Sequence, residues 1–332
     1  MTFECNLCGA ENEMPQGGFA RDAASCAKCS STVRLRALFR ALSIELFNAP
    51  LSLPDFPTVK AIRGLGMSDN QGCAALLAVK FDYRNTFYHQ EPRFDASQSD
   101  PAEQGLYDFV LAGDVFEHVA PPVEAAFRSA FELLKPGGFL AMSAPYSLED
   151  TTREHFRDLH EYSVVRAGGS LALVNRTRDG EWQVFDQLVF HGGAGDTLEL
   201  RLFSESSLRQ LLTAAGCDRV SFIAEDFPPF GIVNQGRGSL PVIAGKGPFS
   251  LSREGVGELA TEYLRCKKYE NRFLDLSAHL KTVDAELEER TRWSVLLKED
   301  SDQLRRTLEA WQKSRWMHLG HAFGLGPEST HK

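Results

Sequence analysis

The sequence of 332 residues lacks several features that mark common protein classes. No run approaches the roughly 20 consecutive apolar residues that a membrane-spanning helix needs. The first residues, MTFECNLCGA, contain no basic segment followed by an apolar core, as a secretory signal would. A net charge of −9 argues against a general nucleic-acid binder, which needs Lys and Arg to neutralise phosphates. We therefore expect a cytoplasmic globular protein.

Glycine and proline are almost absent between residues 256 and 320, and this change in composition helps to divide the chain. A Cys- and Gly-rich start comes first, and short apolar runs that alternate with helical patterns then predict an α/β domain. The predicted segments are a small N-terminal module, a connecting helix with a linker, the α/β domain, a long helix and a tail, at residues 1–32, 33–56, 57–250, 256–318 and 319–332.

The long helical segment has apolar residues at alternating spacings of four and three. This period of 3.5 residues predicts a left-handed coiled coil, in which the polar positions weaken the pairing or set its register. The alternative is a single helix that folds back on the α/β domain. In either case we expect an interaction element, for self-association or for a partner protein. The register runs through Tyr269, Phe273, Leu276, Leu280, Val283, Leu287, Arg290, Ser294, Leu297, Ser301, Leu304, Leu308 and Trp311.

Four of the seven cysteines form two CxxC pairs near the N-terminus, separated by 17 residues. This spacing predicts a four-cysteine zinc site, and a reducing compartment favours metal over disulfides. All four tetrahedral positions would be filled, so the zinc would be structural. Gly9 suits a tight turn with positive φ. The alternative is four free thiols or a redox pair. The predicted ligands are Cys5, Cys8, Cys26 and Cys29.

Arg34, Arg36 and Arg40 follow in a predicted amphipathic helix (VRLRALFRALSIELF). They either bind an anionic substrate or form the solvated face of the helix above its apolar residues. We favour the solvated face, because charged residues on a helix usually face water.

The α/β segment begins with a strand-like run at Val59–Ile62, a turn containing Gly64 and Gly66, and a helical stretch (QGCAALLAVKF). Strand, glycine turn and helix are the first unit of a Rossmann-like sheet. Glycines there let the backbone approach a nucleotide closely. A dinucleotide dehydrogenase would show GxGxxG, and Asp69 breaks that pattern, so hydride transfer is disfavoured.

Carboxylates follow the next two predicted strands. After the strand at 85–89, Glu91 is the best placed to accept from both hydroxyls of a ribose, and Asp95 is second. A buried strand from Tyr107 ends in Asp114, at the carboxyl edge of the expected sheet.

The string YDFVLAGDVFEHV, a helix and then LLKPGGFLAMSAPY resemble the class I S-adenosylmethionine-dependent methyltransferases, in particular bacterial members that act on small molecules and glycans. FSESSLRQLLTAAGCDRVSF and LPVIAGKG look like the later elements of that fold, so the resemblance covers about 57–245. It implies a mostly parallel sheet with helices on both faces, and S-adenosylmethionine as cofactor. It places Gly64 and Gly66 under the methionine moiety, Glu91 near the ribose, Asp95 near the adenine and Asp114 at the mouth of the site. Ser68 is a further candidate for cofactor binding.

The sequence departs from the family pattern at two points. Ile62 stands where an acidic residue usually contacts the methionine amine. Only about 22 residues separate the start of strand two from strand four, so the usual helix and strand between them are shortened or lost.

Methyl transfer needs alignment of the reacting atoms, and a base only where the nucleophile must lose a proton. His155 is our first candidate for that base and His160 our second, because both follow the predicted fifth strand. Tyr146 and His191 are candidates for contacting substrate. A structural role remains the alternative for each histidine.

These observations favour a methyltransferase that acts on oxygen in a small molecule, sugar or glycan. A non-catalytic scaffold with the same fold is one alternative. An RNA methyltransferase guided by the zinc module is another, although the net charge disfavours it.

Overall fold

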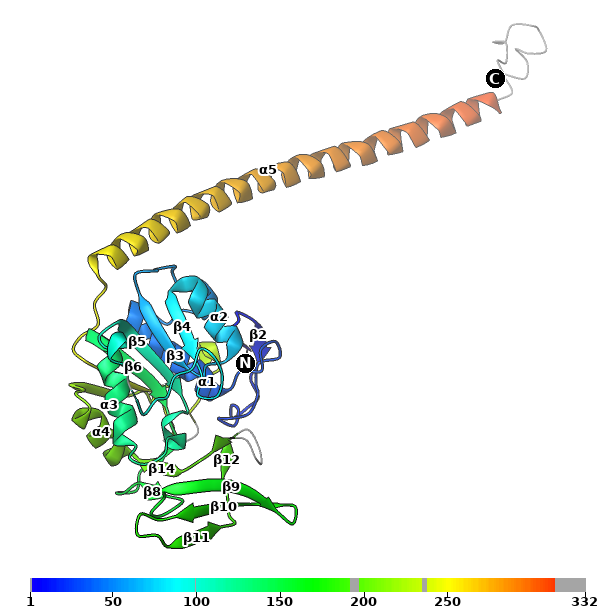
Figure 1. Cartoon of the computed structure of the whole chain (residues 1–332). Helices are drawn as coiled ribbons and strands as arrows, with labels where there is room; N and C mark the ends of the chain where they lie inside the picture. Colours follow the sequence, from blue (N-terminus) through cyan, green and yellow to red (C-terminus); the bar gives the residue numbers. More distant parts are fainter. Residues whose placement is uncertain (1, 99, 192–196, 235–237, 314–332) are drawn as a thin grey trace, which may run out of the picture. The chain divides into compact units, whose positions relative to one another are not determined.

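The computed structural model describes residues 2–98, 100–191, 197–234 and 238–313. Its contacts divide the chain into two compact units, Met1–Glu262 and Tyr263–Lys332. The first contains the α/β domain, and the second consists, in its described part, of the continuation of one helix (Figure 1).

A six-stranded sheet with the order β15-β16-β6-β5-β3-β4 forms the centre of the first unit. The four strands from β6 to β4 are parallel, whereas β16 is antiparallel to β6 and β15 is antiparallel to β16. This is the mostly parallel sheet that the sequence predicted. The bounds are β3 Arg63–Met67, β4 Asp82–Thr86, β5 Tyr107–Gly113, β6 Leu134–Ser143, β15 Arg219–Phe222 and β16 Val242–Gly245.

Helices cover both faces of this sheet, because alternate strand residues point to opposite faces and both sets are apolar. One buried cluster joins α3 and α4 to the sheet. The other joins α1 and α2 to the opposite face and includes apolar residues of the N-terminal module. The helices are α1 Val33–Phe47, α2 Gln71–Lys80, α3 Glu124–Leu133 and α4 Glu205–Ala214, with the 3-10 turns η1 Leu53–Asp55, η2 Pro101–Glu103, η3 Phe116–His118 and η4 Pro228–Phe230.

The expected first strand at Val59–Ile62 is wrong, because the strand is Arg63–Met67. Val59 and Ile62 are buried in a turn before it, so their apolar character reflects packing and not strand pairing. Gly64 and Gly66 consequently lie inside β3. A Cβ at Gly64 would meet the ring of Phe109.

The second predicted strand is also displaced, from 85–89 to Asp82–Thr86. Between β4 and β5, the described residues contain no α-helix and no named strand, but one 3-10 turn, η2, and an isolated bridge between Phe87 and Arg93. The expected loss of a helix and a strand at this point is confirmed.

A long insertion between β6 and α4 forms small sheets beyond the carboxyl ends of the parallel strands (Figure 1). One has the order β11-β10-β9, another pairs β12 with β13, and the third has the order β7-β14-β8. The strands are β7 Tyr146–Ser147, β8 Arg153–Glu154, β9 Glu161–Ala167, β10 Ser170–Arg176, β11 Trp182–Phe185, β12 Phe190–His191, β13 Thr197–Leu198 and β14 Arg201–Ser204.

The N-terminal module pairs β1 (Thr2–Glu4) with β2 (Glu11–Glu13) and is held to the domain by Arg36. The guanidinium of Arg36 is fully buried and donates to Ser25, Ser31, Phe230 and Gly231 at 2.8–3.2 Å. A charge that is buried in this way is stable only because each donor finds an acceptor.

The expectation of a solvated arginine face on α1 is therefore wrong. Arg36 and Arg40 are buried, and Arg34 is mostly covered. The module and the loop at η4 pack over the face that would otherwise meet water, so burial depends on segments distant in sequence.

The helix α5 (Arg253–Gln312) spans 60 residues. Its apolar seam positions from Tyr269 to Trp311 are exposed. Among the described residues, none of the helices is both long and apolar enough to cross a membrane. Residues 314–318 of the predicted long helix and the tail at 319–332 lie outside the described residues.

Candidate functional site

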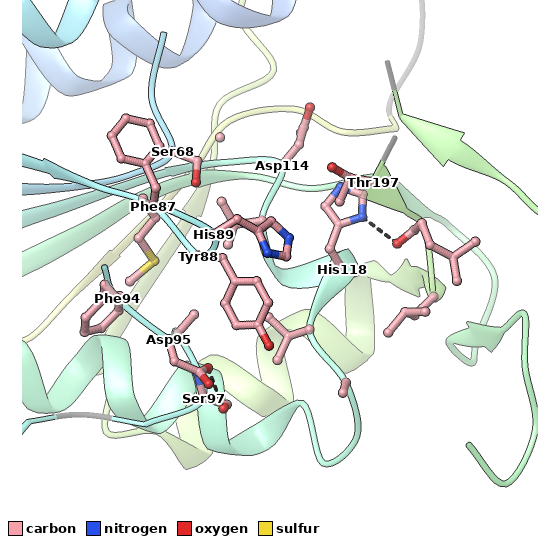
Figure 2. Close-up of a pocket in the computed structure, with 18 of the residues that line it drawn as sticks. Ser68, Phe87, Tyr88, His89, Phe94, Asp95, Ser97, Asp114, His118 and Thr197 are labelled. Carbon is pink, nitrogen blue, oxygen red and sulfur yellow. Dashed lines mark hydrogen bonds between the residues drawn. The ribbon is translucent and has the colours of Figure 1, made fainter. Parts of the chain in front are cut away.

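A cavity of about 1420 Å³ opens at the carboxyl ends of β3, β4 and β5 (Figure 2). Ligands of open α/β sheets bind at this edge, where loops after neighbouring strands converge. The residues that follow the three strands form its floor. The N-terminal module and the start of α1 form one wall, and the insertion forms another. The lining includes Arg21, Asp22 and Arg34 from the first wall, and Tyr162, Val164, Phe190, Thr197, Leu198 and Leu200 from the second.

Ser68 and Asp114 stand directly after β3 and β5, and both have left-handed backbone conformations, with φ of 62° and 54°. Their N–H groups donate to the carbonyls of Thr86 and Ser143, at 2.7 and 2.9 Å. Residues other than glycine adopt such φ values at an energetic cost, and they cluster at functional sites. Both side chains line the cavity, so the strained positions coincide with its floor.

The carboxylate of Asp114 has partners from both α1 and β6. It forms an ion pair with Arg34 of α1, and its Oδ1 accepts from the hydroxyl of Ser143 at 2.9 Å. The Nε of Arg34 contacts Asp22 at 3.0 Å. Burial lowers the pKa of both Arg34 and Arg21, although nearby Asp22 opposes this effect. The cavity therefore contains balanced charges, contributed jointly by the module and the sheet.

His118, at the end of η3, points into the cavity (Figure 2). Its Nδ1 lies 2.8 Å from the carbonyl oxygen of Leu198. A carbonyl only accepts, so Nδ1 carries the proton, and Nε2 of the neutral ring is an acceptor.

The neighbouring carboxyl group of Glu117 is fully buried, and its Oε1 lies 3.7 Å from the Nε2 of His118. Burial raises the pKa of Glu117 to about 8, although its own backbone and Arg34 oppose the shift. A buried carboxyl group with a raised pKa thus stands beside a histidine of the cavity lining.

The loop after β4 forms the remaining side of the floor. Asp95 accepts from the backbone N–H and the hydroxyl of Ser97, at 2.9 and 2.7 Å, and both residues line the cavity (Figure 2). Tyr88 and His89 line it as well. Glu91 does not; its exposed carboxylate accepts from the N–H of Arg93 at 3.0 Å.

Several other predicted site residues also lie outside the lining. Gly64 and Gly66 are inside β3, and a Cβ at Gly66 would meet the Asp69–Tyr83 pair. Tyr146 is buried, with its ring edge-to-face against Phe222.

The two histidines predicted as bases lie in the insertion, and the cavity lining includes neither. His155 contacts the carboxylate of Glu199 through Nε2 at 2.8 Å, and its N–H donates to Leu200, which does line the cavity. His160 is exposed, and its N–H donates to Asn175 at 2.9 Å. His191 belongs to β12, and its side chain lies outside the described part of the structure.

Sequence reasoning missed Arg21, Asp22 and His89, and it assigned no catalytic role to His118. One signal was present for His118, because it follows Asp114 closely at the expected carboxyl edge. No local pattern marked Arg21 or Asp22, which reach the cavity only through the folding of the module.

The four cysteines of the two CxxC pairs converge, with all four sulfur atoms within 4.8 Å of one another. The Sγ atoms of Cys5 and Cys29, and those of Cys8 and Cys26, are 3.6 Å apart. A tetrahedral zinc ion with metal–sulfur bonds of about 2.3 Å requires sulfur–sulfur distances of about 3.8 Å, so the donors fit this ion.

Both CxxC turns have the same backbone form. Gly9, after Cys8, has a φ of 71°, as the sequence predicted, and Ser30, after Cys29, has a φ of 56°. The N–H of each donates to the carbonyl of the first cysteine of its pair, at 2.8 and 2.9 Å. Each turn thereby presents two thiols to one point.

Comparisons with known proteins indicate what kind of domain the central sheet belongs to. Residues 63–221 match a family model described as a methyltransferase domain, and a comparison with curated proteins found no match. Among solved structures, an S-adenosylmethionine-dependent methyltransferase from Mesorhizobium loti is 13% identical, with 65% of this chain and 99% of that chain covered and a TM-score of 0.39.

Two further solved structures are similarly distant. A 1,6-didemethyltoxoflavin N1-methyltransferase from Burkholderia thailandensis is 16% identical, with 64% of this chain and 77% of that chain covered and a TM-score of 0.37. A sugar N-methyltransferase from a Streptoalloteichus species is also 16% identical, with 63% and 85% covered and a TM-score of 0.36. Residues 63–221, which contribute most of the floor of the cavity, form a methyltransferase domain.

Proposed function

We propose that the chain transfers a methyl group from S-adenosylmethionine to an oxygen atom of a small-molecule, sugar or glycan acceptor. The observation that carries the proposal is the cavity at the carboxyl edge of β3, β4 and β5. Its volume of about 1420 Å³ exceeds the roughly 300–1,000 Å³ of a usual small-molecule pocket. It therefore offers room for a cofactor and an acceptor together.

The cofactor would be held by the residues that follow the three strands. The backbone at Ser68 suits a close approach, and Asp95 offers a carboxylate on the β4 side. Asp114 already pairs with Arg34, so it would mark the boundary between cofactor and acceptor. When bound, S-adenosylmethionine supplies an electrophilic methyl group on a sulfonium.

His118 would accept the acceptor's proton. The contact to Leu198 holds its Nδ1 protonated and leaves Nε2 as the basic atom. The Nε2 atom would take the hydroxyl proton as the new carbon–oxygen bond forms, and the adjacent carboxyl of Glu117 would stabilise the resulting imidazolium when it is ionised. This role replaces those that the sequence suggested for His155 and His160.

A structural zinc ion would be held by Cys5, Cys8, Cys26 and Cys29. Arg21 and Asp22 lie between the two cysteine pairs and line the cavity. The ion would therefore support the site indirectly, by fixing the loop that carries these two residues.

Isothermal titration of the zinc-loaded protein with S-adenosylmethionine tests the proposal. We expect saturable binding that Asp95→Ala weakens, whereas the exposed Glu91→Ala leaves it unchanged. Transfer of labelled methyl groups to extract fractions, with identification of the methylated atom, then tests the acceptor. Absence of cofactor binding would leave a non-catalytic scaffold, and labelling of RNA alone would favour an RNA acceptor.

A further inference from the structure

Helix α5 carries a continuous apolar seam that nothing in the described part of the chain covers. Seven-residue repeats place Phe273, Leu280 and Leu287 at the first core position, a, and Leu276 and Val283 at the second, d. These five side chains are between 43% and 68% exposed. An α-helix with such a seam is stabilised when a partner helix buries it, because intrinsic propensity contributes little.

We propose that α5 pairs with α5 of a second copy of this chain, as a parallel coiled coil in register. This inference concerns assembly and is independent of the proposed methyl transfer. In that arrangement each core residue meets its own counterpart, so all layers from Tyr269 to Leu287 are apolar against apolar. Further along the helix, the polar residues Arg290, Ser294 and Ser301 each face the same residue of the second helix.

The antiparallel alternative distributes the polar residues less favourably. With the two seams from Cys266 to Trp311 fully overlapped, Ser301 would face Leu276, Ser294 would face Val283, and Arg290 would face Leu287. Each of these layers would place a polar group against an apolar one, and each would occur twice. In the parallel arrangement, Arg290 can extend its guanidinium out of the seam along its apolar stem.

Charges beside the seam also favour the parallel register. In a parallel pair, the residue before each a position lies beside the residue five places later on the partner helix. Arg265 would lie beside Glu270 of the partner subunit, and Asp300 beside Arg305 of the partner subunit. Both pairs have opposite charge, and no pair of this kind along Arg265–Gln312 has like charge.

Cys266 provides a direct reporter of register, because it occupies an a position and is exposed. In the parallel pair, the two Cys266 residues would lie within the roughly 4.4–6.8 Å Cα separation that a disulfide spans. In the antiparallel pair, Cys266 would lie near Trp311 of the partner subunit. Mild oxidation by copper phenanthroline removes one proton and one electron from each thiol and joins the sulfur atoms.

The experiment uses the full, zinc-loaded chain. We expect light scattering to give the mass of two chains, and oxidation to give a covalent dimer that Cys266→Ser abolishes. In the Cys266→Ser background, Ser294→Cys at another a position should restore the dimer, and Ala278→Cys on the outer face should not. A single-chain mass, or no cross-link through Cys266, would overturn the proposal.

A matched pair of variants tests the seam itself. Leu280→Asp with Leu287→Asp should halve the mass, while thermal unfolding of the methyltransferase domain stays unchanged. Leu274→Asp with Leu296→Asp changes leucines that are just as exposed, at 58% and 54% against 54% and 62%, but lie off the seam. These should leave the mass at two chains. Equal effects of the two pairs would contradict a seam-specific dimer.

Discussion

Arg34, at the start of α1, forms an ion pair with Asp114, the residue directly after β5. The two residues are 80 positions apart in sequence, and they join the N-terminal module to the carboxyl edge of the sheet. The same guanidinium contacts Asp22 at 3.0 Å, between the two cysteine pairs. The cysteine-rich leader is thus part of the cavity and not a separate appendage.

Breaking this pair on one side should destabilise the fold, because a partly buried charge loses one of its partners. Arg34→Met or Asp114→Asn should each cost roughly 2–3 kcal/mol, below the value for a fully buried pair because the Arg34 side chain is 26% exposed. The double variant should cost less than the two together, by about 1 kcal/mol or more. Urea unfolding of all four proteins measures this coupling, and strictly additive costs would show that the pair contributes none.

Replacing His118 should reduce turnover without removing the cofactor site. In His118→Asn the side-chain amide can still donate to Leu198, but it has no basic nitrogen, so kcat should fall by about 100- to 10,000-fold. S-adenosylmethionine affinity should change little. His155→Ala is the comparison, since it removes the contact with Glu199 and should lower stability more than turnover. If kcat fell more in His155→Ala than in His118→Asn, His155 would be the better candidate for the catalytic base.

The stability of the fold should fall with rising pH through Glu117. Its folded-state pKa of about 8 lies above the ordinary 4.5, because burial disfavours the carboxylate. Between these values the folded protein holds a proton that the unfolded chain has released, so the stabilisation is complete below about pH 4.5 and is lost as the pH approaches 8.

Glu117→Gln removes this titration and should flatten the pH dependence by a few kcal/mol across that window. Urea unfolding at pH 5.5 and pH 8 measures the change. Glu149→Gln alters an exposed carboxylate and should keep the wild-type dependence. Wild-type behaviour in Glu117→Gln would mean that this carboxyl is ionised in the folded state.

Loss of the proposed zinc should loosen the cavity as well as the leader. Cys26→Ser should abolish stoichiometric zinc and lower the Tm by several degrees, because a small metal module has little core of its own. Since Arg21 and Asp22 lie between the cysteine pairs, affinity for the cofactor or acceptor should fall in parallel. Cys266→Ser should leave zinc content unchanged. If the metal-free protein were as stable as the zinc-loaded protein, the four thiols would hold no structural ion.

Local patterns accounted for several elements of the α/β domain. The run from Val33 to Phe47 predicted α1 to the residue, and the apolar run from Tyr107 predicted β5, because hydrophobic periodicity is a property of the chain itself. The paired cysteines likewise predicted their own cluster. The run Val59–Ile62 was wrongly predicted as a strand, because a buried turn and a buried strand have the same apolar composition.

The members of the cavity depended on contacts between distant segments. Ser68 was a candidate from the sequence, and it is in the floor because β3 ends at Met67, whereas Gly64 and Gly66 lie inside that strand. Arg34 is on the wall because the module buries the face of α1 that sequence alone assigns to water. The sequence by itself determined helix α1, strand β5, the cysteine pairs and the seam of α5, since each follows from spacing within one segment. Only the tertiary structure decided which charged and titratable groups meet, because long-range packing sets their burial and their partners.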